Sequence, residues 1–347
     1  MADALDVSVV IPTFEMASHL PALWSSLDRS GVLERVREVV IVDDGSNDGN
    51  ATRDALDEIA RGPRGELLKV VHLPQNVGRF RARLTGAKAA RGERVLFLDT
   101  RLVLPDGFGA AVAAAGAKHR SVMGHVDIDV TRNVFCLYWD RSHKFIFRRH
   151  FRDTQDVLIL TAENYDRYLK GTTVFLCERE LFIRASECYD DLLSDDTMLM
   201  KDMVATTPIA IDPSVRIQWV PRENARDFLA RLWERGPGFV EYHVIEHQGR
   251  FFWFVVAGGV VLLAFAGLAA IAPPVAAVAA AGGVLATAAS TGLFAQSIVE
   301  FVKMAPLHVA VVGTFGAAAV RGLGVNAVRA LSKRYGRANP SAAAHSG

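Results

Sequence analysis

The sequence predicts an α/β domain built on a doubly wound, mostly parallel sheet, followed by a region that enters a membrane. Short apolar runs alternate with segments of helical spacing through roughly the first hundred residues, which is typical of βαβ units. Two of these runs stop abruptly at carboxylates, at the sheet edge where ligands bind in such folds. Charged side chains then almost disappear between Phe251 and Leu323, where only Glu300, Lys303 and Arg321 remain.

Composition narrows the possible partners and the compartment. The 347 residues carry a formal net charge of +1, which gives no reason to expect a nucleic-acid partner. The spacing of Cys136, Cys177 and Cys188 fits neither a metal motif nor a small disulfide framework, so we expect reduced thiols. The N-terminus has neither the basic segment nor the apolar stretch of a signal peptide. We therefore expect the α/β domain on the cytoplasmic face of a membrane.

The predicted strands and helices alternate from the first residues. Pro12 closes the first strand, and Asn50 or Asp48 can cap the second helix. Arg79, Arg81 and Arg83 begin the third helix, where basic groups and free N–H groups can hold an anion; for Arg79 and Arg81 a solvated helix end is the better interpretation. Strands are expected at residues 7–12, 39–42, 67–73 and 95–98, and helices at 20–27, 51–59 and 79–90.

Two of the predicted strands bring carboxylates to the same edge of the sheet. The apolar run 39–42 ends at Asp43 and Asp44, and the run 95–98 ends at Asp99. A strand followed by an Asp-Gly turn needs no ligand. Two such ends that face one crevice indicate a bound cation or nucleotide.

Several ordered pieces of the chain resemble family 2 glycosyltransferases. The resemblance is close over about the first 105 residues and looser as far as about Gly236. It implies a Rossmann-like glycosyltransferase A fold and inverting transfer of a sugar from a nucleotide donor. The pieces that carry it are Val9-Val10-Ile11-Pro12-Thr13-Phe14, Val42-Asp43-Asp44-Gly45-Ser46-Asn47-Asp48-Gly49, Asn76-Val77-Gly78, Ala82-Arg83, Gly86, Ala90-Arg91-Gly92-Glu93 and Val95-Leu96-Phe97-Leu98-Asp99.

The resemblance implies a donor site around Asp43. In this family the corresponding carboxylate contacts the nucleotide base, and a carboxylate can accept a hydrogen bond from the imide N–H of uracil. A UDP-sugar is therefore the expected donor, although Glu15 stands where relatives often have Asn and leaves the base open. The residues implied for this site are Pro12, Thr13, Phe14, Glu15, Asp43, Asp44, Ser46, Gly78, Arg83, Asp99 and Arg101.

The metal motif of the family is altered in this chain. Relatives use Asp-x-Asp to hold Mg²⁺ or Mn²⁺ against the two phosphates, and here the motif reads Asp99-Thr100-Arg101. Either Asp99 binds the cation while the phosphates supply other oxygens, or Arg101 neutralises part of the diphosphate charge itself. We favour a retained divalent cation with Asp99 as its protein ligand.

The resemblance also implies an acceptor site and a catalytic base. Gly171 and Thr172 correspond to a turn before the acceptor site, and the pair Asp195-Asp196 stands where the family carries its base, with Asp196 as the expected base. A carboxylate there would take the proton of an acceptor hydroxyl. One of the two aspartates can also cap the following helix. If the acceptor is a lipid phosphate, Asp196 would mainly position groups.

The remainder of the chain predicts membrane attachment. Residues 226–235 form an amphipathic helix suited to the membrane interface, where Arg231 and Trp233 are expected near the acceptor. Relatives often carry Gln-x-x-Arg-Trp here, and its loss argues against a processive polymerase. The expected regions are 1–221 (cytoplasmic domain), 222–250 (interfacial helix and linker), 251–323 (membrane region) and 324–347 (basic, partly disordered tail).

Within the membrane region we expect a hairpin of two spanning helices. Residues 251–271 and 275–294 are uncharged and long enough to cross a bilayer, and Pro273-Pro274 separates them. The third apolar segment, 305–320, can be a span or an interfacial helix. Because the basic tail and the α/β domain both favour the cytoplasm, we expect an even number of crossings, hence two spans.

These observations lead to one main hypothesis and two alternatives. The chain is expected to be a membrane-anchored inverting glycosyltransferase that moves a sugar, from a UDP-sugar first of all, to polyprenyl phosphate or a lipid-linked glycan. The altered metal motif also allows a non-catalytic nucleotide-binding membrane scaffold. A nucleotidyltransferase is disfavoured because its lysine- and glycine-rich N-terminal signature is missing.

Overall fold

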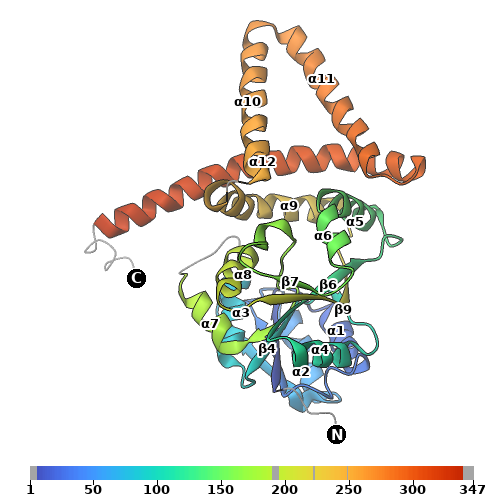
Figure 1. Ribbon diagram of the computed structural model, residues 1–347, viewed down its shortest axis with the longest axis vertical. Coiled ribbons are helices and arrows are strands. Elements are labelled where there is room, and N and C mark those ends of the chain that lie inside the picture. Colours follow the sequence, from blue (N-terminus) through green and yellow to red (C-terminus); the bar gives the residue numbers. More distant parts are fainter. Residues whose placement is uncertain (1–5, 190–194, 222, 248, 339–347) are drawn as a thin grey trace. The chain divides into compact units, whose positions relative to one another are not determined.

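The computed structural model describes residues 6–189, 195–221, 223–247 and 249–338 (Figure 1). The chain divides into two compact units. The first consists of Met1–Arg132 and Ile146–Pro221, and the second of Asn133–Phe145 and Arg222–Gly347.

The first unit is built on a nine-stranded mixed sheet. Four strands pair in parallel in the order β3–β2–β1–β4, as the alternating sequence pattern predicts. The apolar run at residues 39–42 is buried throughout, which is expected of a parallel strand covered on both faces. The four strands are β1 (Val7–Thr13), β2 (Glu38–Asp43), β3 (Leu68–His72) and β4 (Arg94–Leu98), and the helices between them are α1 (Leu20–Arg29), α2 (Ala51–Arg61) and α3 (Arg79–Ala89).

The two faces of this parallel half carry different helices. Side chains alternate between the faces along a strand. Val9 and Ile11 lie in one hydrophobic cluster with Leu23 of α1. On the other face, α3 approaches so closely that a Cβ at Gly86 would lie 2.4 Å from Cγ1 of Val10. The absence of a side chain at Gly86 therefore lets α3 lie directly on the sheet.

The second half of the sheet is mainly antiparallel, so the predicted predominance of parallel pairs holds only for the first half. β8 pairs antiparallel with both β4 and β6, while β6 and β9 pair in parallel. The short strands β5 and β7 add antiparallel pairs to β9. The elements of this half are β5 (Leu102–Val103), α4 (Phe108–Lys118), β6 (Ser121–Ile128), α6 (Arg148–Asp153), β7 (Leu158–Leu160), β8 (Val174–Glu178), α7 (Arg179–Glu187), α8 (Asp195–Thr206) and β9 (Ile209–Trp219), with 3-10 turns at Gly65–Leu67 and Tyr165–Arg167.

The second unit is helical within the described residues. Asn224 caps α9 by accepting a hydrogen bond from the backbone N–H of Asp227. Pro273 stands at the start of α11 and ends the preceding helix, as expected. Figure 1 shows α10 and α11 as a hairpin, with α12 running across its base beside α9. The elements are α5 (Val134–Ile146), α9 (Ala225–Val240), a π-helical turn at Glu241–Glu246, α10 (Arg250–Ile271), α11 (Pro273–Ser290), a 3-10 turn at Thr291–Leu293 and α12 (Ile298–Ala338).

Close packing joins α9 to α12. A Cβ at Gly236 would lie 2.2 Å from the carbonyl oxygen of Ala318, so only glycine allows this approach. Asn326 donates to the carbonyl oxygen of Pro237 at 3.0 Å. Two residues of the apolar face predicted for α9, Phe228 and Leu232, are buried inside this unit. Protein contacts therefore cover much of the face that the sequence suggested for the bilayer.

Among the described residues, three helices are long and apolar enough to cross a membrane, by length and composition. They are Phe251–Ile271, Pro273–Leu293 and Ile298–Ser332. The first two match the expected hairpin closely. The third contains the expected segment 305–320 but is much longer. That it does not cross the bilayer stays a prediction.

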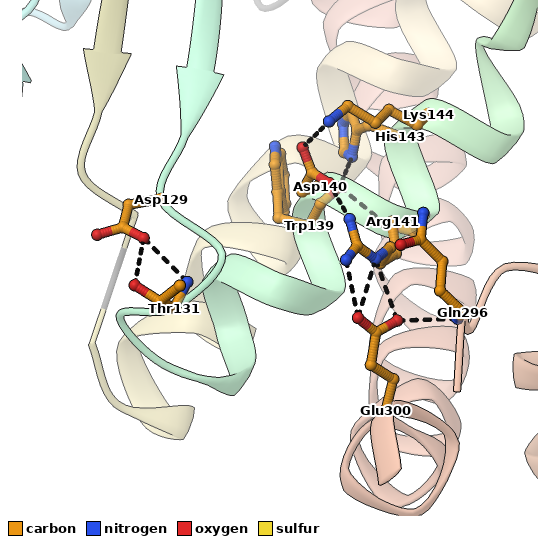
Figure 2. Close-up of polar contacts among 10 residues, drawn as sticks. Asp129, Thr131, Trp139, Asp140, Arg141, His143, Lys144, Gln296 and Glu300 are labelled. Carbon is orange, nitrogen blue, oxygen red and sulfur yellow. Dashed lines mark hydrogen bonds and ion pairs between the residues drawn. The ribbon is translucent and has the colours of Figure 1, made fainter. Parts of the chain in front are cut away.

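A network of charged groups ties α5 to α12 (Figure 2). Arg141 pairs with Glu300 at 2.8 Å and with Asp140 at 2.9 Å, and Lys144 pairs with Asp140 at 2.7 Å. Glu300 also accepts from the backbone N–H of Gln296 at 2.9 Å. Because Asp140, Arg141 and Glu300 are largely removed from solvent, loss of Arg141 would take away the cation with which the buried Glu300 carboxylate pairs.

His150 in the first unit makes stability depend on pH. Its ring stacks on His125, and within the described chain its Nδ1 has no hydrogen-bond partner. Burial first, and then the neighbouring His125 and Lys170, lower the pKa of His150 from 6.5 to about 4. His150 therefore binds a proton below pH 6.5 in the unfolded chain but only below about pH 4 in the folded chain. This difference corresponds to about 3 kcal/mol.

We expect the unfolding free energy to fall between pH 6.5 and pH 4, and His150→Phe to reduce that fall. Chemical denaturation of the purified chain at a series of pH values measures it. His119→Phe, at the end of α4, is the matched control and should keep the wild-type pH dependence. Equal pH dependence in His150→Phe and wild type would contradict the prediction.

Candidate donor and acceptor sites

The carboxyl ends of β1, β2 and β4 meet at one edge of the sheet. Thr13 is the register partner of Asp43. The carbonyl oxygen of Thr13 accepts a hydrogen bond from the N–H of Asp44 at 2.8 Å. Thr100, after β4, donates its hydroxyl to the carbonyl oxygen of Pro12 at 3.1 Å. The structure thus brings together the strand ends that the sequence assigned to one crevice.

Asp43 is held in a fixed orientation at this edge. Its Oδ1 accepts from the N–H of Ser46 at 3.1 Å, and its Oδ2 lies 3.0 Å from Nδ1 of His72. The Ser46 hydroxyl in turn accepts from the N–H of Glu15 at 2.8 Å. Glu15 has a φ of +52° and follows the exposed ring of Phe14. These contacts build a rim around Asp43, and His72 is a member that the sequence pattern did not single out.

Asp44 supports a loop, although the sequence grouped it with the residues that contact nucleotide. Its carboxylate accepts from the N–H groups of Val77 at 2.8 Å and Gly78 at 3.0 Å. Burial raises the pKa of this carboxyl, and the two hydrogen bonds oppose the rise. Gly45, with φ +70°, leaves no space for a side chain against Gln75. Asp44 therefore shapes the turn that begins α3.

Asp99 is anchored from two sides. Arg83, which is only 2% exposed, donates Nη2 to its Oδ1 at 3.0 Å. Thr173 donates its hydroxyl to Oδ2 at 3.1 Å. The antiparallel register pairs Leu98 with Val174 and so places Thr173 beside Asp99. Thr173 was missed in the sequence because its partner is set by this long-range pairing.

Arg101 is directed at the end of β9. Its Nε donates to the carbonyl oxygen of Val220 at 2.9 Å, and its Nη2 donates to that of Pro221 at 2.8 Å. Its own carbonyl oxygen accepts from the N–H of Val220 at 3.0 Å. The guanidinium that replaces the second carboxylate of the metal motif is thus bound to backbone carbonyls.

The protein groups around Asp99 offer few ligands to a cation. No group of three or more His, Cys, Asp or Glu side chains within the described ranges could hold a metal ion. The side chain of Asp99 is 26% exposed, and each carboxylate oxygen has a second acceptor position beyond its bonds to Arg83 and Thr173. The site therefore fits a divalent cation only when other oxygens, such as those of a diphosphate, complete its coordination.

The loop before β8 lies beside the start of α8. The hydroxyl of Tyr165 donates to the carbonyl oxygen of Thr197 in the first turn of that helix. The Lys170 ammonium lies 4.3 Å from the centre of the Tyr165 ring, and its side chain is only 7% exposed. Burial lowers the pKa of Lys170 to about 8. A lysine before a glycine turn gives no local signal, so the sequence pattern did not single it out.

The other residues expected on the acceptor side are only partly described. Thr172 is buried, and Gly171 has open space around its Cα. Asp195 and Asp196 begin α8, but their side chains lie outside the described residues. In the second unit, Arg231 pairs with Glu234 at 2.8 Å, and the exposed ring of Trp233 contacts Arg321.

Part of the chain matches a known protein family. Residues 8–165 match the family described as "Glycosyl transferase family 2". A 100-residue segment is 37% identical to the "Undecaprenyl-phosphate 4-deoxy-4-formamido-L-arabinose transferase" of Aeromonas hydrophila subsp. hydrophila, covering 28% of this chain and 30% of that protein. The protein of the same description from Pectobacterium carotovorum subsp. carotovorum is 27% identical over 182 residues, which cover 52% of this chain and 55% of that protein. The matches thus span about half of these relatives at most.

A solved structure supports the fold of the chain. The mannosyltransferase PcManGT from Pyrobaculum calidifontis, in complex with GDP-Man and Mn²⁺, is 18% identical, with a TM-score of 0.59. The likeness covers 92% of this chain and 87% of that one. The expected α/β glycosyltransferase A fold with apolar helices at its C-terminal end is therefore confirmed, and structures with this fold have been solved with a divalent cation.

Proposed function

We propose that this chain, in which residues 8–165 form a glycosyl transferase family 2 domain, is a membrane-bound enzyme that transfers a sugar from a nucleotide donor to a membrane-associated acceptor. One observation carries the proposal. Asp43 and the Arg83–Asp99 pair converge at the carboxyl ends of neighbouring strands, in a chain that also contains helices able to span a bilayer.

The donor would bind across this edge. Asp43, oriented by Ser46 and His72, would accept a hydrogen bond from the base, and uracil offers an imide N–H. Asp99 and Arg83 would lie at the diphosphate. A divalent cation held by Asp99 and the phosphate oxygens would neutralise charge that develops on the leaving diphosphate. The support for a cation is the carboxylate of Asp99, whose side chain is 26% exposed.

The reaction proposed is a single inverting displacement. An acceptor oxygen forms a bond to the anomeric carbon while the bond between that carbon and the diphosphate oxygen breaks. When the acceptor is a hydroxyl, Asp196 takes its proton. When the acceptor is a phosphate monoester, its oxygen is already ionised near neutral pH, and Asp196 would position it.

We favour polyprenyl phosphate as the acceptor, with a lipid-linked glycan as the second choice. The relatives from Aeromonas and Pectobacterium are described as undecaprenyl-phosphate transferases. The ammonium of Lys170, which lies 3.9 Å from the Asp166 carboxylate and over the Tyr165 ring, would add positive charge for a phosphate.

The proposed topology puts the first unit on the cytoplasmic face, with α10 and α11 crossing the membrane and α12 lying in the interface. The packing of α12 along α9, across the base of the hairpin, supports this (Figure 1). Basic residues toward the end of α12, including Arg321 and Arg329, favour the cytoplasmic side.

The purified full-length chain tests the proposal when it is incubated with UDP-sugars and undecaprenyl phosphate in lipid nanodiscs. We expect a sugar-bearing polyprenyl product and free UDP. Nucleotide binding without transfer or hydrolysis of any donor would instead support the scaffold alternative, which the altered Asp99-Thr100-Arg101 motif keeps open.

A further inference from the structure

Arg101 occupies the position at which the resembling family carries its second metal ligand. A guanidinium supplies no oxygen to a cation, so this position cannot coordinate a metal. What it does instead follows from its contacts. It donates from two nitrogens to two successive carbonyl oxygens, those of Val220 and Pro221.

The contact is a closed clamp between two turns of the first unit. The Arg101 carbonyl oxygen accepts from the Val220 N–H, while its side chain donates to the carbonyl oxygens of Val220 and Pro221. The neighbouring residues continue the pairing, since Leu102 is the register partner of Trp219. Arg101 thus fixes the turn between β4 and β5 to Val220 and Pro221, the two residues that follow β9.

The clamp and a second metal ligand exclude each other. An aspartate at position 101 has no donor for the two carbonyl oxygens, and its carboxylate would repel them. Asp99 lies two residues earlier in the same turn, where it is held by Arg83 and Thr173. The placement of the one carboxylate left at the diphosphate site therefore depends on protein contacts from three directions.

We infer that Arg101 is a positioning residue for the donor site. It fixes the turn that carries Asp99, and it stands where the resembling family has a metal ligand. The inference rests on the proposed function. The clamp acts on the protein itself, so it shapes the site equally with and without a cation. Its loss should weaken nucleotide binding by the same factor in both conditions, whereas loss of a metal ligand weakens binding only when the cation is present.

Calorimetric binding of UDP and GDP to the purified full-length chain tests this, with Mn²⁺ and with EDTA. Arg101→Met keeps an unbranched stem and removes every donor. We expect it to raise the Kd of the bound nucleotide about tenfold in both conditions. Arg101→Lys retains one cationic donor group and should recover part of the affinity. In a transfer assay KM for the donor should rise while kcat at saturating donor stays within about threefold of wild type.

Arg216→Met is the matched control. Arg216 lies on β9 and pairs with Asp127 at 2.9 Å, so this variant removes an arginine from the same strand without touching the clamp, and its Kd should equal that of wild type. Wild-type affinity in Arg101→Met, or a loss seen only with Mn²⁺, would overturn the positioning role while leaving the proposed function intact. A wild-type chain that binds neither UDP nor GDP would overturn both.

Discussion

Replacing Asp99 by Asn is expected to lower kcat/KM for the donor by about a hundredfold to a thousandfold. The substitution removes the negative charge that orients the buried guanidinium of Arg83. It also removes the carboxylate that we propose as the protein ligand of a cation at the diphosphate. Loss of one such group that stabilises developing charge costs about 10²–10³ in rate. A coupled assay for released UDP, with the full-length chain in nanodiscs, measures the effect.

The same substitution is expected to affect folding, so stability must be measured beside activity. The buried guanidinium of Arg83 would lose the carboxylate that accepts from its Nη2, which costs up to about 3 kcal/mol when one partner of a largely buried pair is removed. Thermal unfolding of Asp99→Asn should therefore show a lower Tm. Asp106→Asn, an exposed carboxylate in the next loop, is the control and should change neither quantity.

A double variant separates the two effects. Arg83→Met combined with Asp99→Asn removes both members of the pair, so part of the stability lost in Asp99→Asn should return because the buried cation that lost its carboxylate is gone as well. Activity should not recover. Full transfer activity in Asp99→Asn, or restored activity in the double variant, would remove Asp99 from the donor site.

The sequence predicts the parallel half of the fold because that half is encoded locally. The run Val39–Val42 is buried on both faces of the sheet, so it is apolar without interruption and easy to identify. Asp43 and Asp99 follow directly from such runs, and the parallel pairing of β1 with β2 and β4 brings their ends together. Here local pattern and chain topology point to the same edge.

The antiparallel half and its contacts depend on pairings between distant segments, which leave no local mark. Thr173 contacts Asp99 across 74 positions of the sequence, and Arg101 reaches Pro221 across 120. Asp44 was grouped with the ligand-binding residues because it is adjacent to Asp43. In the structure it accepts two backbone hydrogen bonds from the loop at Val77 and Gly78.

In the membrane region, too, composition predicts some features, while others depend on contacts between distant residues. The uncharged stretches that became α10 and α11 were identified from composition alone. The third segment was expected only at 305–320 because Glu300 and Arg321 interrupt its apolar character. The helix nevertheless continues through both, since Glu300 pairs with Arg141 and Arg321 lies over the ring of Trp233.

Replacing Asp196 by Asn should distinguish the two classes of acceptor. Asp196 lies in the first turn of α8, whose position is fixed by the Tyr165 hydroxyl on the Thr197 carbonyl and by the buried side chains of Leu199 and Met200. With a lipid-linked glycan, the acceptor hydroxyl must lose its proton, and removal of the base should lower kcat by about 10²–10⁴. With undecaprenyl phosphate, the second pKa of a phosphate monoester, at about 6, leaves most of the acceptor oxygen ionised at neutral pH, so the loss should stay below about tenfold.

The measurement compares both acceptors with the same enzyme preparation, so a folding defect would lower both rates together. Asp195→Asn is the matched control, because it makes the same substitution at the neighbouring carboxylate in the first turn of α8. It should retain most activity with either acceptor. Because the phosphate needs no base, a large drop in the rate of transfer to the glycan alone would identify Asp196 as the base. Wild-type rates with both acceptors in Asp196→Asn would show that the proton leaves by another route.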